Sequence, residues 1–264
     1  MKTFRRFAWI LSLSFLLISA DLFGSSAFAT EILLEPATIQ RPVGGKARVR
    51  IYATSAVDLI SMGVKLSFDP AVLQATGCSK YEAFDDGWLM DGDGNSATTN
   101  DQYKLPLVEI DNENGTVRMI GGRLIGTSTT GLSGKVLLGW IDFTAVGSGE
   151  SALTVDLAKY HPNHPAKKFD NFVRLSGQVD EPENLPEVLG YIYAGSDACE
   201  CDLNSDKSCN ILDYQLFIQK WGSKTCHDAK TFCACDLNND GSCNILDYQI
   251  FIQKWGSKTC HDFP

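Results

Sequence analysis

Acidic and amide side chains recur at alternate positions in two twelve-residue segments near the C-terminus. The segments run from Asp202 to Asp213 and from Asp236 to Asp247. Oxygen-bearing side chains occupy positions 1, 3, 5, 9 and 12, and position 7 is a serine whose backbone carbonyl can add a ligand. Ca²⁺ takes six to eight hard oxygen ligands, and alternate side chains of a tightly curled loop converge on one point. The sequence therefore predicts two Ca²⁺ sites. Their ligand sets are Asp202, Asn204, Asp206, Ser208, Asn210 and Asp213, and Asp236, Asn238, Asp240, Ser242, Asn244 and Asp247.

The two loops differ at position 6, where the chain of such a loop turns sharply with φ > 0. Gly241 suits that turn, whereas Lys207 costs on the order of 1 kcal/mol there. We therefore expect the second loop to bind Ca²⁺ more tightly. Position 12 is Asp in both loops, a shorter arm than Glu, but extracellular calcium sites need affinities of only about 10⁻⁴–10⁻³ M. The alternative is a pair of polar turns that bind no metal.

A helix is predicted directly after each loop, with the sequences ILDYQLFIQKWG and ILDYQIFIQKWG. Gly222 and Gly256 are the expected C-terminal stops. The apolar surface of these helices is wider than one small core requires. Two readings stay open, and both can hold: the helices pack against each other, or part of the surface meets a partner protein. The candidate partner-binding residues are Ile211, Leu212, Ile218, Ile245, Leu246 and Ile252.

Loop and helix together form a tandem repeat. Residues 199–228 and 233–262 align without a gap at a period of 34, and 26 of 30 positions are identical. Tetratricopeptide units also have this period, but they are pairs of helices with no acidic loop.

The N-terminus predicts export. Basic residues open the chain, an apolar run extends from Phe7 to Ala20, and small residues end at Ala29. This order is typical of a secretory signal peptide over residues 1–29. An uncleaved anchor is the alternative, but the apolar run is shorter than the roughly 20 residues that span a bilayer. The mature chain would hold 20 Lys and Arg against 31 Asp and Glu, a net charge of −11, which disfavours nucleic acid and anionic membranes as partners.

Cysteines of an exported protein are expected to form disulfides. Cys78 is isolated and its role stays open, whereas the other eight of the nine cysteines lie in the repeats. Eight cysteines allow 105 connectivities. Pairing between Cys209 and Cys243 and pairing within each repeat are both possible. Zinc binding through Cys-x-Cys is the sharper alternative, although no zinc-type x₂ spacing is present. The disulfide candidates are Cys199, Cys201, Cys209, Cys226, Cys233, Cys235, Cys243 and Cys260.

Residues 30–180 read as a β-sandwich domain. Apolar residues alternate with polar ones over 46–54 and 60–68, and Gly, Pro, Asn and Asp separate the segments. Further strands are predicted at 116–122, 135–146, 151–157 and 171–179. Residues 181–196 are the expected linker, although their stretch VLGYIY is also compatible with a last strand or a pad under the C-terminal repeats. Residues 197–264 then form the repeat module.

Duplicated loop-plus-one-helix units resemble type I dockerin modules, which anchor proteins to cohesin domains in cellulosome-like assemblies. The resemblance covers about residues 197–262. It implies a small α module with two EF-hand-like calcium loops and a cohesin-bearing partner. Two features depart from the family. The eight cysteines are additional, and positions 10–11 of each loop are Ile-Leu where cellulosomal dockerins often carry small polar recognition residues, so partner specificity does not carry over.

The sandwich resembles cohesin domains and their carbohydrate-binding-module relatives. The resemblance lies in GVKLSFDPAVLQATGC, with its Phe-Asp-Pro turn, and in GKVLLGWIDFTAVGSGESALTV. It implies a mainly β jelly-roll sandwich with a binding role, to a dockerin-bearing protein or to polysaccharide. No row of three exposed aromatics is evident, and Trp88 and Trp140 are expected to be packing residues. The segment Asp91–Asn95 resembles the start of a calcium loop but has Gln102 at the twelfth position, so we expect a polar loop.

Catalytic patterns are weak. His161 and His164 lie in a proline-rich turn, and no Ser-His-Asp set or spaced carboxylate pair stands out on strand ends. We therefore expect a secreted or cell-surface, non-catalytic, calcium-dependent assembly or adaptor protein of cellulosome-like type, linked to polysaccharide catabolism. The alternatives are a carbohydrate-binding protein anchored through its dockerin-like C-terminus and a degenerate hydrolase.

Overall fold

The computed structural model describes residues 30–84, 107–123, 130–161, 164–168, 171–226 and 233–261. The predicted signal peptide, Trp88, the Asp91–Asn95 segment and Gln102 lie outside these residues. Within them, no helix is long and apolar enough to cross a membrane.

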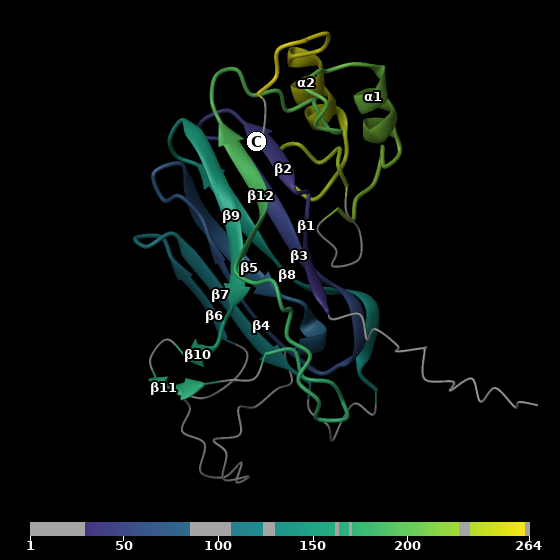
Figure 1. Ribbon diagram of the computed structural model, residues 1–264. Coiled ribbons are helices and arrows are strands. Elements are labelled where there is room, and N and C mark those ends of the chain that lie inside the picture. The colour runs from purple at the N-terminus through teal and green to yellow at the C-terminus, as the bar shows by residue number, and fades with distance from the viewer. Residues whose placement is uncertain are drawn as a thin grey trace, which may run out of the picture.

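Two β-sheets face each other and form the sandwich (Figure 1). One sheet has four strands and the other six, and neighbouring strands are antiparallel except for the parallel pair β2–β12. The four-stranded sheet has the order β1 (Glu31–Glu35), β3 (Lys46–Leu59), β8 (Leu132–Ala145) and β5 (Leu73–Lys80). The six-stranded sheet has the order β2 (Thr38–Arg41), β12 (Glu187–Ala194), β9 (Gly149–Leu157), β4 (Ser61–Ser67), β7 (Thr116–Gly122) and β6 (Leu107–Asp111).

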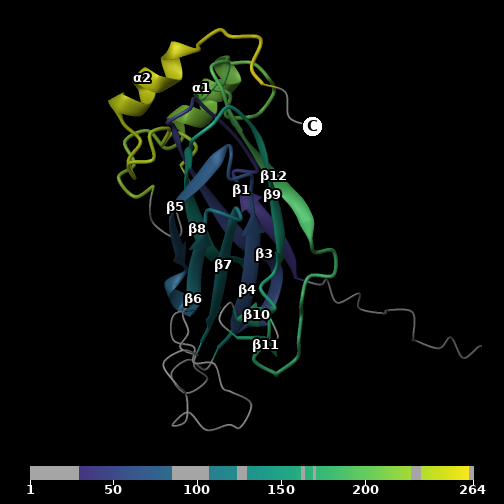
Figure 2. The ribbon, with the colours of Figure 1, turned by 90° about the vertical axis from the view of Figure 1, so that its left-hand side faces the viewer.

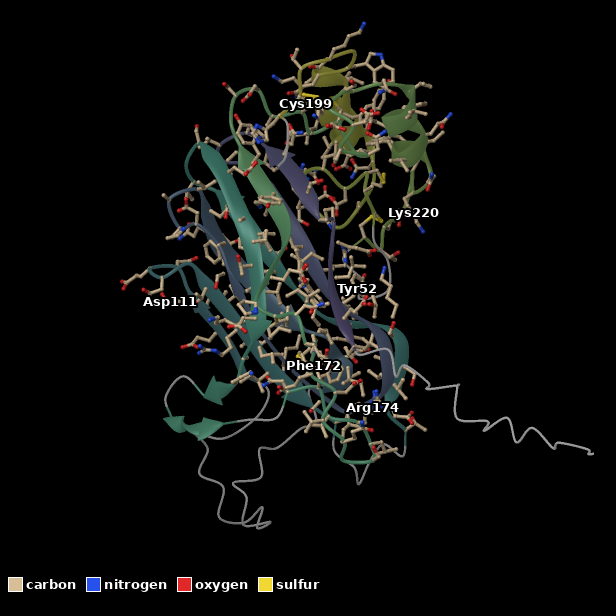
Figure 3. The ribbon with its side chains drawn as sticks, viewed as in Figure 1. Tyr52, Asp111, Phe172, Arg174, Cys199 and Lys220 are labelled. Carbon is tan, nitrogen blue, oxygen red and sulfur yellow. A yellow bond between two sulfur atoms is a disulfide. The ribbon has the colours of Figure 1, made fainter. Side chains whose placement is uncertain are left out.

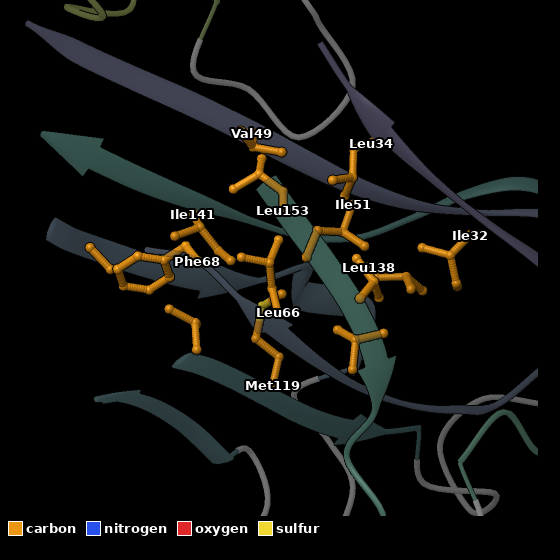
Figure 4. Packing of buried hydrophobic residues seen from close by; sticks show 14 of the residues in the cluster. Ile32, Leu34, Val49, Ile51, Leu66, Phe68, Met119, Leu138, Ile141 and Leu153 are labelled. Carbon is orange, nitrogen blue, oxygen red and sulfur yellow. The ribbon is translucent and has the colours of Figure 1, made fainter. Parts of the chain in front are cut away.

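The core lies between the two sheets because each strand turns alternate apolar side chains inward. Val49 and Ile51 of β3 and Leu66 of β4 are fully buried there (Figure 4). Phe68 and Phe143 meet edge to face at 5.2 Å between ring centroids. The mainly β sandwich is thus confirmed, and strands lie at five of the six predicted places: 46–54, 60–68, 116–122, 135–146 and 151–157.

The prediction of a strand over 171–179 is wrong. This segment makes only isolated bridges, from Arg174 to Leu59 and between Val173 and Val179. The Arg174 amide instead donates to the carbonyl of Gln178, so the chain turns within the segment. Because the chain reverses direction within residues 171–179, the segment cannot form one continuous strand.

The expected linker over 181–196 also needs correction. β12 occupies residues 187–194 of that span and lies inside the six-stranded sheet, between β9 and β2. Ile192 and Ala194 are fully buried in the sandwich core. The alternative, a last strand, is what the structure shows, because the stretch supplies an apolar face that the sheet buries.

Short elements complete the described chain. A 3₁₀ turn, η1 (Glu82–Phe84), follows β5, and β10 (Tyr160–His161) and β11 (His164–Lys168) form a separate hairpin. The hairpin places the backbones of His161 and His164 in register opposite each other, on either side of the predicted turn.

The C-terminal module, residues 197–261, caps one end of the sandwich (Figures 1 and 2). It contains two short helices, α1 (Ile211–Ile218) and α2 (Ile245–Gln253). Both end several residues before Gly222 and Gly256, which adopt φ values of +80° as the predicted helix stops require. Cys199 lies where the module meets the sandwich (Figure 3).

Candidate functional site

Each predicted calcium loop is a curled cradle held by its own side chains. In the first loop, the Asp202 carboxylate accepts the backbone amides of Asp206 and Lys207 at 3.0 and 3.1 Å. Asn204 Oδ1 also accepts the Asp206 amide, at 3.0 Å. The second loop repeats these bonds at equivalent positions and distances. The alternating polar residues therefore do bend the chain around a common point.

The aspartate at position 12 ties each loop to the helix that follows it. Asp213 is fully buried, and its carboxylate accepts the amides of Leu203, Asn204 and Asn210 at 2.8–3.2 Å. Asn210 caps α1 by accepting the amide of Leu212 at 2.8 Å. Asn244 and Asp247 form the same reciprocal capping box at α2. Loop closure and helix initiation thus share the same residues.

The geometry fits a hard divalent cation. In each loop one carboxylate oxygen from each of three aspartates lies within 4.8 Å of the others. Ligands on opposite sides of a Ca²⁺ ion are separated by about twice the 2.3–2.6 Å bond, or roughly 5 Å. The clusters are Asp202, Asp206 and Asp213, and Asp236, Asp240 and Asp247. The remaining predicted ligands lie in the same loops: Asn204, Ser208, Asn210, Asn238, Ser242 and Asn244.

Burial in the loops shifts the pKa of two of the clustered carboxylates. Burial, with a contribution from the neighbouring Asp213 charge, raises the pKa of Asp202 to about 6 even though backbone amides oppose the shift. Burial likewise raises the pKa of Asp247. Carboxylates held this close without a counter-ion repel one another, and a cation between them removes that cost. The donor chemistry and the electrostatics both suit calcium.

Backbone conformation supports the predicted difference at position 6. Lys207 is held at φ = +70° and Gly241 at φ = +92°, a region that only glycine adopts freely. Position 4 is also left-handed, with Ser205 at +60° and Asn239 at +56°. Asn tolerates this conformation better than Ser. The sequence analysis did not include position 4, which adds to the backbone strain of the first loop.

Four disulfides link the eight cysteines of the repeats. Two close a loop within one repeat, and two join the first cysteine of one repeat to the last of the other. Of the two pairings left open, the structure shows the one within each repeat for Cys209 and Cys243. The thiols required by the zinc alternative are all consumed. The pairs are Cys201–Cys209, Cys235–Cys243, Cys199–Cys260 and Cys226–Cys233.

The two helices meet through a pair of equivalent aromatics. Phe217 and Phe251 are fully buried and lie 4.8 Å apart between ring centroids. On either side of them are two matching hollows of about 420 Å³ each. One is lined by Ile211, Tyr214, Tyr248, Phe251, Ile252 and Trp255, and the other by their repeat counterparts. The helix pair therefore has an internal two-fold pseudosymmetry.

All six candidate partner-binding residues are exposed, each by 45 % or more of its surface. They are Ile211, Leu212, Ile218, Ile245, Leu246 and Ile252. Trp221 and Trp255 are also exposed and belong to the same surface, which the sequence analysis missed. We call these eight residues the helix face. The wide apolar surface of the predicted helices indicated that some of these side chains would be exposed.

Trp140 is a half-buried packing residue, as predicted. The guanidinium of Arg48 lies 5.5 Å from the centre of its ring. Among the Phe, Tyr and Trp residues of the sandwich whose burial the structure describes, none is exposed, and Trp221 and Trp255 of the helix face are the exposed tryptophans of the described chain.

Comparison with known families identifies the C-terminal module. Residues 200–254 match the family described as dockerin type I domain. These residues form a type I dockerin domain. The match covers both acidic loops and both helices.

The sandwich is similar in structure to cohesin domains. CaCohA2 from Clostridium acetobutylicum matches at 15% identity and a TM-score of 0.42, over 64% of this chain and 94% of that one. A type I cohesin–dockerin complex from Clostridium thermocellum matches at 10% and 0.42, over 63% and 99%. A non-cellulosomal cohesin from Archaeoglobus fulgidus matches at 14% and 0.40, over 64% and 92%. No curated protein matches this chain by sequence.

Proposed function

We propose that this chain is a secreted, non-catalytic adaptor that joins a partner protein to its own sandwich through a calcium-loaded dockerin. The single observation that carries the proposal is the combination of two complete acidic loops with an exposed helix face in one dockerin domain. The helix face of eight large apolar residues is too extensive to be ordinary solvent-exposed surface on so small a module.

The dockerin couples its loops to its helix face through shared residues. Asp213 and Asp247 belong to the predicted ligand sets and also complete the capping boxes at the start of α1 and α2. A bound Ca²⁺ ion would supply positive charge that lets the three carboxylates of each loop stay together. Asp202, Asp206 and Asp213 would hold it in the first loop, and Asp236, Asp240 and Asp247 in the second. Because the caps and the ligands coincide, ordering a loop orders the start of its helix.

The partner class follows from the domain type. Dockerins of the solved complexes are bound to cohesins, as in the complex from Clostridium thermocellum. We propose a cohesin-bearing secreted or cell-surface protein as the partner of the helix face, and a dockerin-bearing protein as the partner of the sandwich. A link to polysaccharide breakdown rests on the cellulosome-like resemblance of both halves, and carbohydrate binding by the sandwich stays the second prediction.

The test uses the mature oxidised chain and, as probe, the cohesin of the Clostridium thermocellum complex. Binding is measured by surface plasmon resonance in millimolar Ca²⁺ and in chelator. We expect binding only with Ca²⁺, and its loss by at least about a hundredfold in the double variant Leu212→Asp/Leu246→Asp, since two buried charges oppose an apolar interface.

Val43→Asp is the matched control, because Val43 is an exposed apolar residue on the sandwich. It should leave binding unchanged. Binding in Ca²⁺ that ignores the charges on the helix face would refute the proposed role of that face.

A further inference from the structure

Gln40 of β2 is a buried polar side chain of the sandwich whose hydrogen bonds all go to the dockerin. Only 4% of the residue is exposed. Its Oε1 accepts the backbone amides of Cys199 and His261 at 3.0 and 3.1 Å. Its Nε2 donates to the carbonyl of His261 at 3.2 Å and lies 3.4 Å from Oδ2 of Asp202. Gln40 thus forms hydrogen bonds to both ends of the dockerin, which the Cys199–Cys260 disulfide joins.

The calcium loops themselves touch the sandwich, each through its position 4. Ser205 of the first loop shares a hydrogen bond with the hydroxyl of Thr38. Asn239 of the second loop donates its amide to Asp142 at 3.2 Å, on a carboxylate that Arg48 also binds at two points. The loop side of the dockerin is therefore occupied, while its helix face stays exposed.

Charged groups of the sandwich line the contact with both repeats. Arg50 donates to the carbonyl of Cys226. Arg41, Arg48 and Arg50 border a cavity of about 50 Å³, whose other walls include Asp236 and Asn239. Burial lowers the pKa of Arg41 and raises the pKa of Glu200, and the attraction between their charges partly opposes both shifts.

The C-terminal end of the dockerin is held as well. The imidazole of His261 stacks on the ring of Tyr193 from β12, at 3.7 Å between centroids and 3° between planes. Its Nε2 lies 2.9 Å from the Glu150 carboxylate at the start of β9. This contact fixes the last described residue against the six-stranded sheet.

The two repeats differ at four of their 30 aligned positions. Two of these positions lie at the contact with the sandwich and have different neighbours in the two repeats. In the first repeat, Ser205 contacts Thr38 and Glu200 interacts electrostatically with Arg41. At the equivalent positions of the second repeat, Asn239 contacts Asp142 and Ala234 lines the small cavity. A nearly symmetric module on an asymmetric surface must differ at its contact points if it is to bind in one orientation only.

We propose that this end of the sandwich, centred on Gln40, is a docking site for the chain's own dockerin. The dockerin binds it in one fixed orientation, through the loop side and the disulfide that joins its ends. The two modules then form one rigid unit, in which the helix face is held at a fixed angle to the sandwich, rather than two modules joined by a flexible linker. This inference does not depend on the identity of the external partner.

The test is amide hydrogen exchange of the mature oxidised chain in saturating Ca²⁺, read at Cys199 and His261. Both amides are bound to Gln40, so they should be protected in the native chain. Gln40→Ala should accelerate their exchange by about tenfold or more, because their acceptor is lost. Small-angle X-ray scattering should show one compact arrangement for the native chain and an expanded ensemble for the variant.

A repeat swap keeps the inference testable if Gln40→Ala does not fold. Ser205→Asn/Asn239→Ser exchanges the two contact residues, whereas the matched control Leu216→Ile/Ile250→Leu exchanges two equivalent residues of α1 and α2. The first swap should loosen the docking and the second should not. Unprotected amides with an expanded native ensemble, or equal behaviour of both swaps and the native chain, would overturn the fixed docking.

Discussion

Phe143 in the sandwich belongs to a core of apolar side chains from both sheets, whereas Phe217 in the dockerin belongs to a core in which eight of the eleven buried residues are half-cystines. The sandwich core draws on nine strands and contains Ile51, Leu66 and Leu138 among many other aliphatic residues. The dockerin core consists of its eight cysteines with Phe217, Leu237 and Phe251. A chain segment of about 65 residues buries too small a fraction of its surface for apolar packing alone. In small domains cross-links or bound metal take over that role, and this dockerin has four disulfides.

The largest expected effect comes from removing both supports of the dockerin at once. Reducing the disulfides in the presence of a chelator should unfold the dockerin and leave the sandwich folded. In a small domain each lost native disulfide costs about 2–5 kcal/mol, which is comparable with its whole stability. Two-dimensional ¹H–¹⁵N NMR would show collapse of the dockerin resonances only.

Chelation with the disulfides intact is the control for that experiment. It should disturb the loops but leave the Phe217–Phe251 contact, because the four disulfides still hold the helices. Simultaneous collapse of the sandwich in the reduced sample would contradict the division of stabilising forces between the two regions.

Substitution of one position-12 aspartate should remove the calcium ion of that loop only. Asp213→Asn and Asp247→Asn each replace a buried carboxylate by a neutral side chain of the same shape, so the calcium stoichiometry should fall from two to one in each variant. Calorimetric titration measures it directly. Asp156→Asn in the sandwich is the matched control and should still bind two ions. Unchanged stoichiometry in either loop variant would show that its site is assigned wrongly.

The difference between Lys207 and Gly241 should appear as a modest difference in affinity. Lys207→Gly relieves the cost of a side chain at φ = +70°, about 1 kcal/mol, so the first loop should bind calcium about fivefold more tightly. Gly241→Lys should weaken the second loop by a similar factor.

Lys207→Ala separates charge from conformation in that comparison. It removes the ammonium group but retains the strained Cβ, so it should gain less than glycine does. Equal gains from alanine and glycine would mean that charge, not backbone conformation, distinguishes the loops.

The last prediction concerns the free cysteine of the sandwich, which takes no part in the contrast between the two loops. Burial, with repulsion from Asp142, raises the pKa of Cys78 to about 12, and the nearby Lys80 only partly opposes this. A raised pKa means that almost no thiolate is present at pH 8, so alkylation by iodoacetamide should be at least about a hundredfold slower than in the denatured chain. Labelling of Cys78 at the denatured rate in the folded protein would show that its environment is more open than described.

The sequence predicted most accurately where a pattern alone determines the geometry. The twelve-residue spacing of Asp202 to Asp213 implied a cradle, and the structure places three carboxylates together in it. Alternation over 46–54 implied a strand with one buried face, which β3 has. Gly222 and Gly256 marked turns that require positive φ, and both adopt it.

Features that depend on contacts between distant segments were not predictable. The role of β12 depends on its neighbours β2 and β9, and an Ile-Tyr stretch after two prolines reads equally well as a linker or a strand. The disulfide partners of Cys199 and Cys226 depend on how the repeats face each other. Gln40 carries no local signal, because only the folded chain brings Cys199 and His261 to it.

The central claim is that calcium in the two loops keeps the helix face in its binding form. Its most direct test is a calcium titration of the mature oxidised chain in which calcium binding and binding of the Clostridium thermocellum cohesin are measured on the same samples. The account predicts that cohesin binding rises in step with occupancy of the loops and falls sharply in Asp213→Asn and Asp247→Asn. Cohesin binding of full strength in chelator, with the dockerin still folded, would contradict it.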